Sequence, residues 1–139
     1  MTPHQITLVK TSFAKVLPIK DIAAAAFYDR LFTADPALKP LFKGDMKAQG
    51  QKLMMAIGTV VASLDRLDAV IGTVQDMARR HVGYGVQDSH YATVGAALLD
   101  TLASAFGDDF TPETRDAWAT AYGILSGAMI DAAKTVKAA

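Results

Sequence analysis

The sequence predicts an all-α fold, and two observations carry this prediction. Alanine, leucine, methionine and valine are abundant, and β-branched clusters such as Val60–Val61 lie inside segments with a helical spacing of apolar residues. Proline, glycine and capping residues divide the chain into segments of helical length. Since 51% of the 139 residues are apolar and 20% are charged, we expect one domain, spanning residues 1–139, that buries a core.

Helix boundaries follow from the residues that begin and end helices. Thr2 is a cap followed by Pro3 at the first helical position, and Thr111 and Pro112 repeat this pattern before the last helix. Pro18 interrupts the first helix, because an interior proline lacks an amide donor and clashes with the preceding turn. The expected helices span approximately residues 2–16, 20–33, 36–42, 47–64, 67–81, 88–106 and 111–139.

The lengths of these seven helices are very unequal. Residues 43–45 and 107–109 are expected to be turns, and Gly83 and Gly85 follow the end of the 67–81 helix. Helices of such different length do not predict a four-helix bundle. They favour an irregular helical packing with room for a ligand inside it.

Composition and charge exclude several classes of function. Acidic and basic residues balance at 14 each, so the electrostatic attraction that dominates nucleic-acid binding is missing. The absence of cysteine removes disulfides, thiolate metal sites, iron–sulfur clusters and thioether-linked haem. No signal peptide and no run of about 18 apolar residues is visible, so we expect a cytoplasmic protein without a membrane span.

The three histidines, His4, His81 and His90, are the first candidates for chemistry. His81 follows Val74 and Met77 by seven and four positions, which places it on the apolar stripe near the end of its helix. A histidine there is either a metal ligand or an ordinary residue of the core or surface, and the spacing leaves both open. The helix C-terminus favours a protonated ring, so ligation requires a hydrogen-bond acceptor or the metal itself to hold the ring neutral.

Four further side chains lie where a ligand pocket could form. Gln49 and Leu53 are one helical turn apart and share a face. Tyr28 lies among apolar neighbours in its helix, and Phe42 ends the short third helix. Each has an ordinary alternative, because Gln49 could be solvated, Tyr28 could be a core tyrosine with its hydroxyl in solvent, and Phe42 could simply fill the core.

The sequence contains no motif typical of hydrolytic, nucleotide-binding or zinc sites. There is no Gly-x-Ser-x-Gly elbow, no phosphate-binding loop and no His-x-x-x-His or Glu-x-x-His pair. Gly83-Tyr84-Gly85 follows a helix rather than a strand, so it is not a dinucleotide loop. What remains is a helical protein with one well-placed histidine, and haem with a single protein axial ligand fits that inventory.

Four segments, in a specific order and separation, resemble one known family. They are residues 26–32 (AFYDRLF), 36–42 (PALKPLF), 79–95 (RRHVGYGV followed by HYATVG) and 117–123 (AW followed by AYG). Over nearly its whole length the chain resembles the bacterial single-domain globins, the group related to Vitreoscilla haemoglobin, flavohaemoglobin haem domains and neuroglobin-like chains. The resemblance implies a globin fold of about seven helices around a haem pocket.

The resemblance also implies a role for six residues. His81 matches the proximal histidine that binds the haem iron. A shift of one residue would put Ala48 or Gly50 in place of Gln49, because the preceding loop varies in length. The other five roles are as follows: Phe42 packs on the haem face, Tyr28 hydrogen-bonds oxygen, Gln49 is the distal polar residue, Leu53 limits the distal pocket and Tyr91 lies near the proximal histidine.

One departure from the family concerns the last helix. Flavohaemoglobin-like members carry a glutamate that polarises the proximal imidazole, and the matching position here, counted from Tyr122, is Ala133. Asp131 lies about 200° away around the helix, so it is no obvious substitute. The resemblance therefore implies a more neutral His81, bonded to the backbone, and weaker support for peroxidase-like chemistry.

The function implied is reversible, high-affinity binding of oxygen and of CO and NO by a non-covalent haem b, with hydrogen bonds from Tyr28 and Gln49. An alternative is oxidation of nitric oxide to nitrate with a separate reductase, since we expect no flavin or nicotinamide domain after the globin unit. A haem-based sensor or a haem-free regulatory globin is a third class, and the presence of His81 with Phe42 argues against the haem-free form. With Gln49 at the distal position, ligation by two histidines is not expected.

Overall fold

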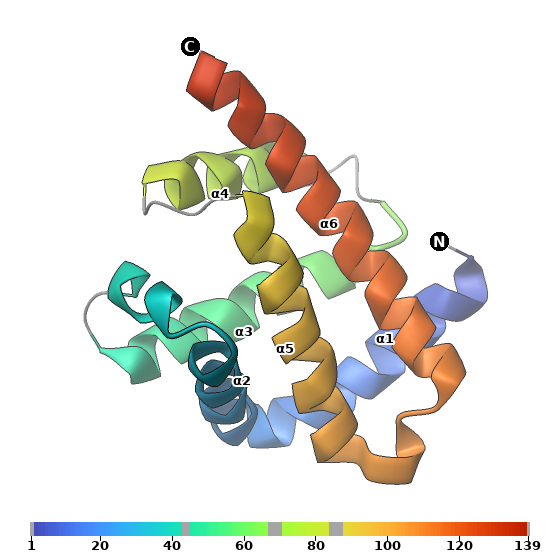
Figure 1. Cartoon of the computed structure of the whole chain (residues 1–139). Helices are drawn as coiled ribbons and strands as arrows, with labels where there is room; N and C mark the ends of the chain where they lie inside the picture. Colours follow the sequence, from blue (N-terminus) through green and yellow to red (C-terminus); the bar gives the residue numbers. More distant parts are fainter. Residues whose placement is uncertain (1, 43–44, 67–70, 84–87, 139) are drawn as a thin grey trace.

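The computed structural model describes residues 2–42, 45–66, 71–83 and 88–138, and the regular structure in these ranges is helical (Figure 1). The α-helices are α1 Pro3–Val16, α2 Lys20–Ala34, α3 Met46–Ala62, α4 Ile71–Gly83, α5 Asp88–Phe106 and α6 Pro112–Ala138. In the described ranges, 3-10 helices join some of them: η1 Leu17–Ile19, η2 Pro36–Leu41 and η4 Gly107–Asp109. The prediction of an all-α fold is confirmed.

The N-terminal helix forms where its capping residues predict. The Thr2 side chain accepts a hydrogen bond from the Gln5 amide at 3.1 Å, and the Gln5 side chain accepts one from the Thr2 amide at 3.0 Å. This reciprocal pair satisfies two amide groups that a helix start leaves without partners. Pro18 lies in η1, directly after α1, so the predicted interruption is confirmed.

Three predicted boundaries need adjustment. The helix expected at 36–42 is the 3-10 helix η2, because in an α-helix the ring of Pro40 would clash with the carbonyl of Pro36, four residues earlier. The helix expected at 47–64 ends at Ala62, and Ser63 has left helical geometry. The helix expected at 67–81 is described from Ile71 and continues to Gly83, while residues 67–70 and 43–44 lie outside the described residues.

The helices pack across one another at several angles rather than as a bundle (Figure 1). Helix α6 contacts α1, α4 and α5, and α2 contacts α3 and α5. Trp118 of α6 is buried beside Phe13 of α1, with ring centroids 6.3 Å apart, and its indole N–H donates to Ser12 Oγ at 2.8 Å. None of the described helices is both long and apolar enough to cross a membrane.

Buried side chains form one large cluster and two smaller ones. The main core joins α1, α2, α3, α5 and α6 around Trp118. The Tyr28 cluster consists of Phe27, Tyr28, Leu31, Leu38 and Ala97, with Phe32, Leu41, Phe42, Leu53, Val94 and Leu98 packed against it. The α4–α6 cluster consists of Val74, Ala78 and Met129, with Met77, Tyr91, Leu125, Ala128 and Ala132 packed against it. The two smaller clusters hold most of the side chains singled out from the sequence.

Candidate functional site

Tyr28 of α2 presents a buried hydrogen-bond donor. Its side chain is only 8% exposed, and its hydroxyl donates to the backbone carbonyl of Gln49 on α3 at 3.2 Å. Burial raises the pKa of Tyr28 to about 12, because the phenolate would lose its hydration. The hydroxyl therefore keeps its proton at neutral pH and remains a donor.

Aromatic rings surround this hydroxyl-bearing residue. The Tyr28 ring lies 5.3 Å from Phe42 and 5.9 Å from Phe32, centroid to centroid, and these two phenylalanines are 5.4 Å apart. Leu53 packs against both the main core and the Tyr28 cluster. The structure thus brings together three of the side chains named from the sequence, Tyr28, Phe42 and Leu53, with the backbone carbonyl of Gln49 beside them.

A close crossing of α2 and α3 sets the distance between Tyr28 and Gln49. Gly50 is buried, and a Cβ atom on it would lie 3.0 Å from the Cβ of Ala24. Carbon atoms in contact are normally about 3.5–4.0 Å apart, so only glycine permits this approach without displacement. The glycine at this crossing therefore brings the first turns of α3 within reach of the Tyr28 hydroxyl.

His81 lies in the last turns of α4 and is half-buried. Its Nδ1 lies 2.6 Å from the carbonyl oxygen of Met77, and the proton between them belongs to the ring because a carbonyl cannot donate. Burial lowers the pKa of His81, the hydrogen bond to Met77 partly opposes this, and Arg80 adds to it. The ring is therefore neutral, with its lone pair on Nε2, the atom by which such an imidazole ligates a metal.

Tyr91 of α5 packs against the α4–α6 cluster, on the side of the molecule that carries His81. Its backbone carbonyl accepts a hydrogen bond from the hydroxyl of Tyr122 on α6 at 2.6 Å. The sequence pointed to Tyr122 only as part of the AYG motif and gave it no role. A contact between residues 31 positions apart leaves no periodic signal in a single sequence.

The last helix has no buried carboxylate at Ala133, the position that matches the family glutamate. Ala133 is 3% exposed, so a small apolar side chain occupies this buried position. The Asp131 side chain is 80% exposed and pairs with Lys134 at 3.9 Å. Both observations agree with the expectation that Asp131 is no substitute.

The remaining histidines lie elsewhere. His90 is half-buried in α5. His4 is exposed and lies 3.4 Å from Glu113.

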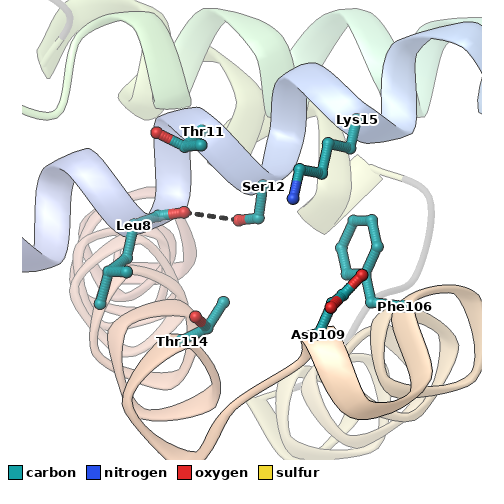
Figure 2. Close-up of a pocket in the computed structure, with 7 residues that line it drawn as sticks. All are labelled: Leu8, Thr11, Ser12, Lys15, Phe106, Asp109 and Thr114. Atoms are coloured by element: carbon teal, nitrogen blue, oxygen red, sulfur yellow. Dashed lines mark hydrogen bonds between the residues drawn. The ribbon is translucent and has the colours of Figure 1, made fainter.

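A separate hollow lies between α1, the end of α5 and the start of α6 (Figure 2). Its volume is about 130 Å³, and Lys15 and Asp109 point their charged ends into it. Its buried hydroxyls are paired within the protein, since Ser12 donates to the Leu8 carbonyl at 2.6 Å and Thr114 lies 3.0 Å from the Thr111 hydroxyl. None of its lining residues belongs to the groups around Tyr28 or His81.

The fold is that of the globin class. The chain belongs to the globin family, whose model matches residues 25–129. The predicted resemblance to bacterial globins is confirmed, and membership of this family implies haem as the cofactor.

Named relatives narrow the comparison. A flavohemoprotein of Vibrio cholerae is 31% identical over 94% of this chain and 34% of its own length. A flavohemoprotein of Deinococcus radiodurans is 33% identical over 94% of this chain and 33% of its own length. The chain therefore spans about a third of the length of the flavohemoproteins it matches.

Solved structures show the same fold. A bacterial globin from Campylobacter jejuni has a TM-score of 0.88 and 28% identity, covering 99% of this chain and 100% of that one. An engineered carbene transferase, made from a Rhodothermus marinus protein assigned as a nitric oxide dioxygenase, has a TM-score of 0.90 and 26% identity. That comparison covers 99% of this chain and 96% of the other.

The described residues fit haem in their chemistry. A neutral imidazole with its lone pair on Nε2 is a suitable axial ligand, and the Met77 carbonyl fixes that tautomer. The Tyr28 cluster supplies the apolar surface that a porphyrin requires, together with one protonated donor. These two groups come from different helices, as a ligand bound between helices requires.

Proposed function

We propose that residues 1–139 form one globin domain that holds haem b without a covalent bond and reversibly binds oxygen and other diatomic gases with high affinity. The observation that carries the proposal is the buried Tyr28 hydroxyl, a protonated donor beside Gln49 in an apolar cluster. The lack of cysteine supports haem b, because no thioether attachment is possible. A cytoplasmic location is part of the proposal.

His81 is the proposed axial ligand, and Phe42, Leu53 and Tyr91 are the proposed cofactor contacts. When bound, haem would supply a ferrous centre able to bind a diatomic gas. His81 would meet it through Nε2, since Nδ1 is held by the Met77 carbonyl. Phe42 and Leu53, packed against the Tyr28 cluster, would exclude water from the gas-binding side.

Tyr28 and Gln49 are the proposed distal donors. The 3.2 Å bond from the Tyr28 hydroxyl to the Gln49 carbonyl is longer than the usual O–H···O distance of about 2.7–2.8 Å, so it is weak. A charge-assisted bond to a polarised ligand contributes about 1.5–3 kcal/mol, against about 0.5–1.5 kcal/mol for a neutral bond. The hydroxyl therefore gains by turning from the carbonyl to the ligand.

The test is the rate at which the haem-loaded protein releases oxygen, measured by stopped flow. Tyr28→Phe removes the hydroxyl and keeps the ring, and the loss of one charge-assisted bond is expected to speed release by about 10- to 100-fold. Phe32→Leu is the matched control, because Phe32 stacks on Tyr28 but offers no donor. An unchanged release rate in Tyr28→Phe would sink the proposed distal role.

Oxidation of nitric oxide to nitrate is the second candidate function. It is favoured by the fold match to the Rhodothermus marinus protein assigned as a nitric oxide dioxygenase, and by relatives that are flavohemoproteins. Repeated turnover needs electrons, so the proposal includes a separate reductase as partner. Nitric oxide consumption by the oxygenated protein, followed with and without an added reductase, tests it: consumption that stops after one equivalent in both cases argues for gas binding alone.

A further inference from the structure

Tyr122 of α6 holds the first turns of α5 through two contacts. Its hydroxyl donates to the backbone carbonyl of Tyr91 at 2.6 Å, at the short end of the range for such bonds. Its ring lies against Gly95, one turn further along α5, where a Cβ atom would come within 2.7 Å of the Tyr122 Cε2 atom. The hydroxyl contact and the ring contact together therefore fix the position of this turn along the axis of α5 and its rotation about that axis.

The turn that Tyr122 holds is the one that carries Tyr91. The Tyr91 side chain packs against the α4–α6 cluster, as does Met77 of α4. The Met77 carbonyl is the acceptor for the Nδ1 proton of His81 at 2.6 Å. A movement of the Tyr91 side chain would therefore also displace the turn of α4 that contains Met77, and this turn orients the His81 ring.

The Tyr122 hydroxyl, by which α6 contacts this turn of α5, is uncharged. Burial raises the pKa of Tyr122, and the nearby Tyr91 phenol adds to the effect, so the hydroxyl stays protonated and keeps donating. The buried position at Ala133 carries no polar atom on its side chain, and Asp131 is exposed and paired with Lys134. Among the described residues of α6, Tyr122 thus supplies a polar contact to the turn that bears Tyr91.

We propose that Tyr122 is a positioning residue of the His81 side of the site, acting through Tyr91 on the orientation of the imidazole. Its hydroxyl sets where Tyr91 stands, and Gly95 is required because any side chain there would push the Tyr122 ring away. The consequence for His81 rests on the proposed haem function. The hold on α5 does not, and it is measured separately.

The hold on α5 is tested by hydrogen exchange of the backbone amides at 91–95. Tyr122→Phe removes the hydroxyl and keeps the ring, and exchange there is expected to be roughly two- to tenfold faster, the equivalent of one net hydrogen bond. Ser12→Ala is the matched control, since it removes the hydrogen-bond partner of Trp118, one turn before Tyr122 in α6, and leaves the contacts of Tyr122 with α5 intact. It is expected to leave exchange at 91–95 unchanged.

The effect on His81 is tested by the iron–histidine stretching band of the ferrous, haem-loaded protein. The band is expected to shift in Tyr122→Phe and in Gly95→Ala, which displaces the ring while keeping the hydroxyl, and to stay in place in Ser12→Ala. Gly95→Ala also serves if Tyr122→Phe does not fold.

Two results would overturn the proposal. Unchanged exchange at 91–95 in Tyr122→Phe would show that Tyr122 does not hold α5. The second result would be an iron–histidine stretching band that does not shift in Tyr122→Phe or in Gly95→Ala, with stability lowered as in Ser12→Ala. It would show that Tyr122 contributes only to packing. Failure of the unaltered protein to take up haem would remove the proposed function, while the exchange result would still decide whether Tyr122 holds α5.

Discussion

The close crossing of α2 and α3 makes Gly50→Ala an informative substitution. The new Cβ would lie 3.0 Å from the Cβ of Ala24, so the neighbouring atoms of the two helices must move apart by a few tenths of an ångström. Overpacking of this kind costs about 1–3 kcal/mol, whereas alanine in a helix interior gains about 1 kcal/mol over glycine. The net change in the free energy of unfolding is therefore a loss of up to about 2 kcal/mol.

Gly127→Ala measures the gain in helix propensity without the cost of overpacking. Gly127 lies within α6, and nothing lies within 4 Å of the Cβ that alanine would add, so only the propensity gain applies. Urea unfolding of both variants should place Gly50→Ala about 1–3 kcal/mol below Gly127→Ala in the free energy of unfolding. Equal stabilisation of the two variants would refute the close crossing.

The same substitution reports on the site. Separating α3 from α2 moves the Gln49 carbonyl away from the Tyr28 hydroxyl, so the 3.2 Å bond between them should break. The oxygen release rate should then change in Gly50→Ala and stay the same in Gly127→Ala. Adding Ala24→Gly to Gly50→Ala restores the space and should restore the rate.

Three further predictions concern stability and His81. Burial raises the pKa of Tyr28 to about 12 and also raises the pKa of Tyr122, so the folded protein keeps protons that the unfolded chain loses above about pH 10. The free energy of unfolding should therefore fall as the pH rises from 10 to 12. Tyr28→Phe should make this fall less steep. Ser12→Ala leaves the buried Trp118 N–H unpaired and should cost about 1–3 kcal/mol in urea unfolding, whereas Thr7→Ala, an exposed hydroxyl of the same helix, should change stability by less than about 0.5 kcal/mol. The iron–histidine stretching frequency should be low, as for a neutral imidazole bonded to a carbonyl; a high frequency, typical of an anionic ring, would contradict the role given to Met77.

The helices were largely predictable because their ends are written in local residues. Thr2 caps α1 through contacts within one turn, and Pro18 interrupts it without help from distant residues. The segment after Pro36 was predicted as a helix because its start signal is strong. The 3-10 geometry depends on Pro40, whose ring would clash with the carbonyl of Pro36 in an α-helix.

The candidate side chains could be named from the sequence, but the contacts that they make could not. Spacing placed His81 on an apolar stripe, and the structure supplies the acceptor, Met77, one turn earlier on that stripe. The bond from Tyr28 to the Gln49 carbonyl joins residues 21 positions apart through a crossing that only Gly50 permits. Nothing in a single sequence predicts that crossing, or the contact of Tyr122 with Tyr91, because both depend on how whole helices pack.

The central claim is that His81 binds haem iron, and an absorption spectrum tests it most directly. The purified protein, supplied with haem, is recorded in its ferric and reduced forms beside His81→Ala, with His90→Ala as the control histidine. We predict stoichiometric uptake, a reduced form that takes up oxygen and carbon monoxide, and spectra changed by His81→Ala and not by His90→Ala. Spectra indifferent to His81, or no uptake of haem, would contradict the claim.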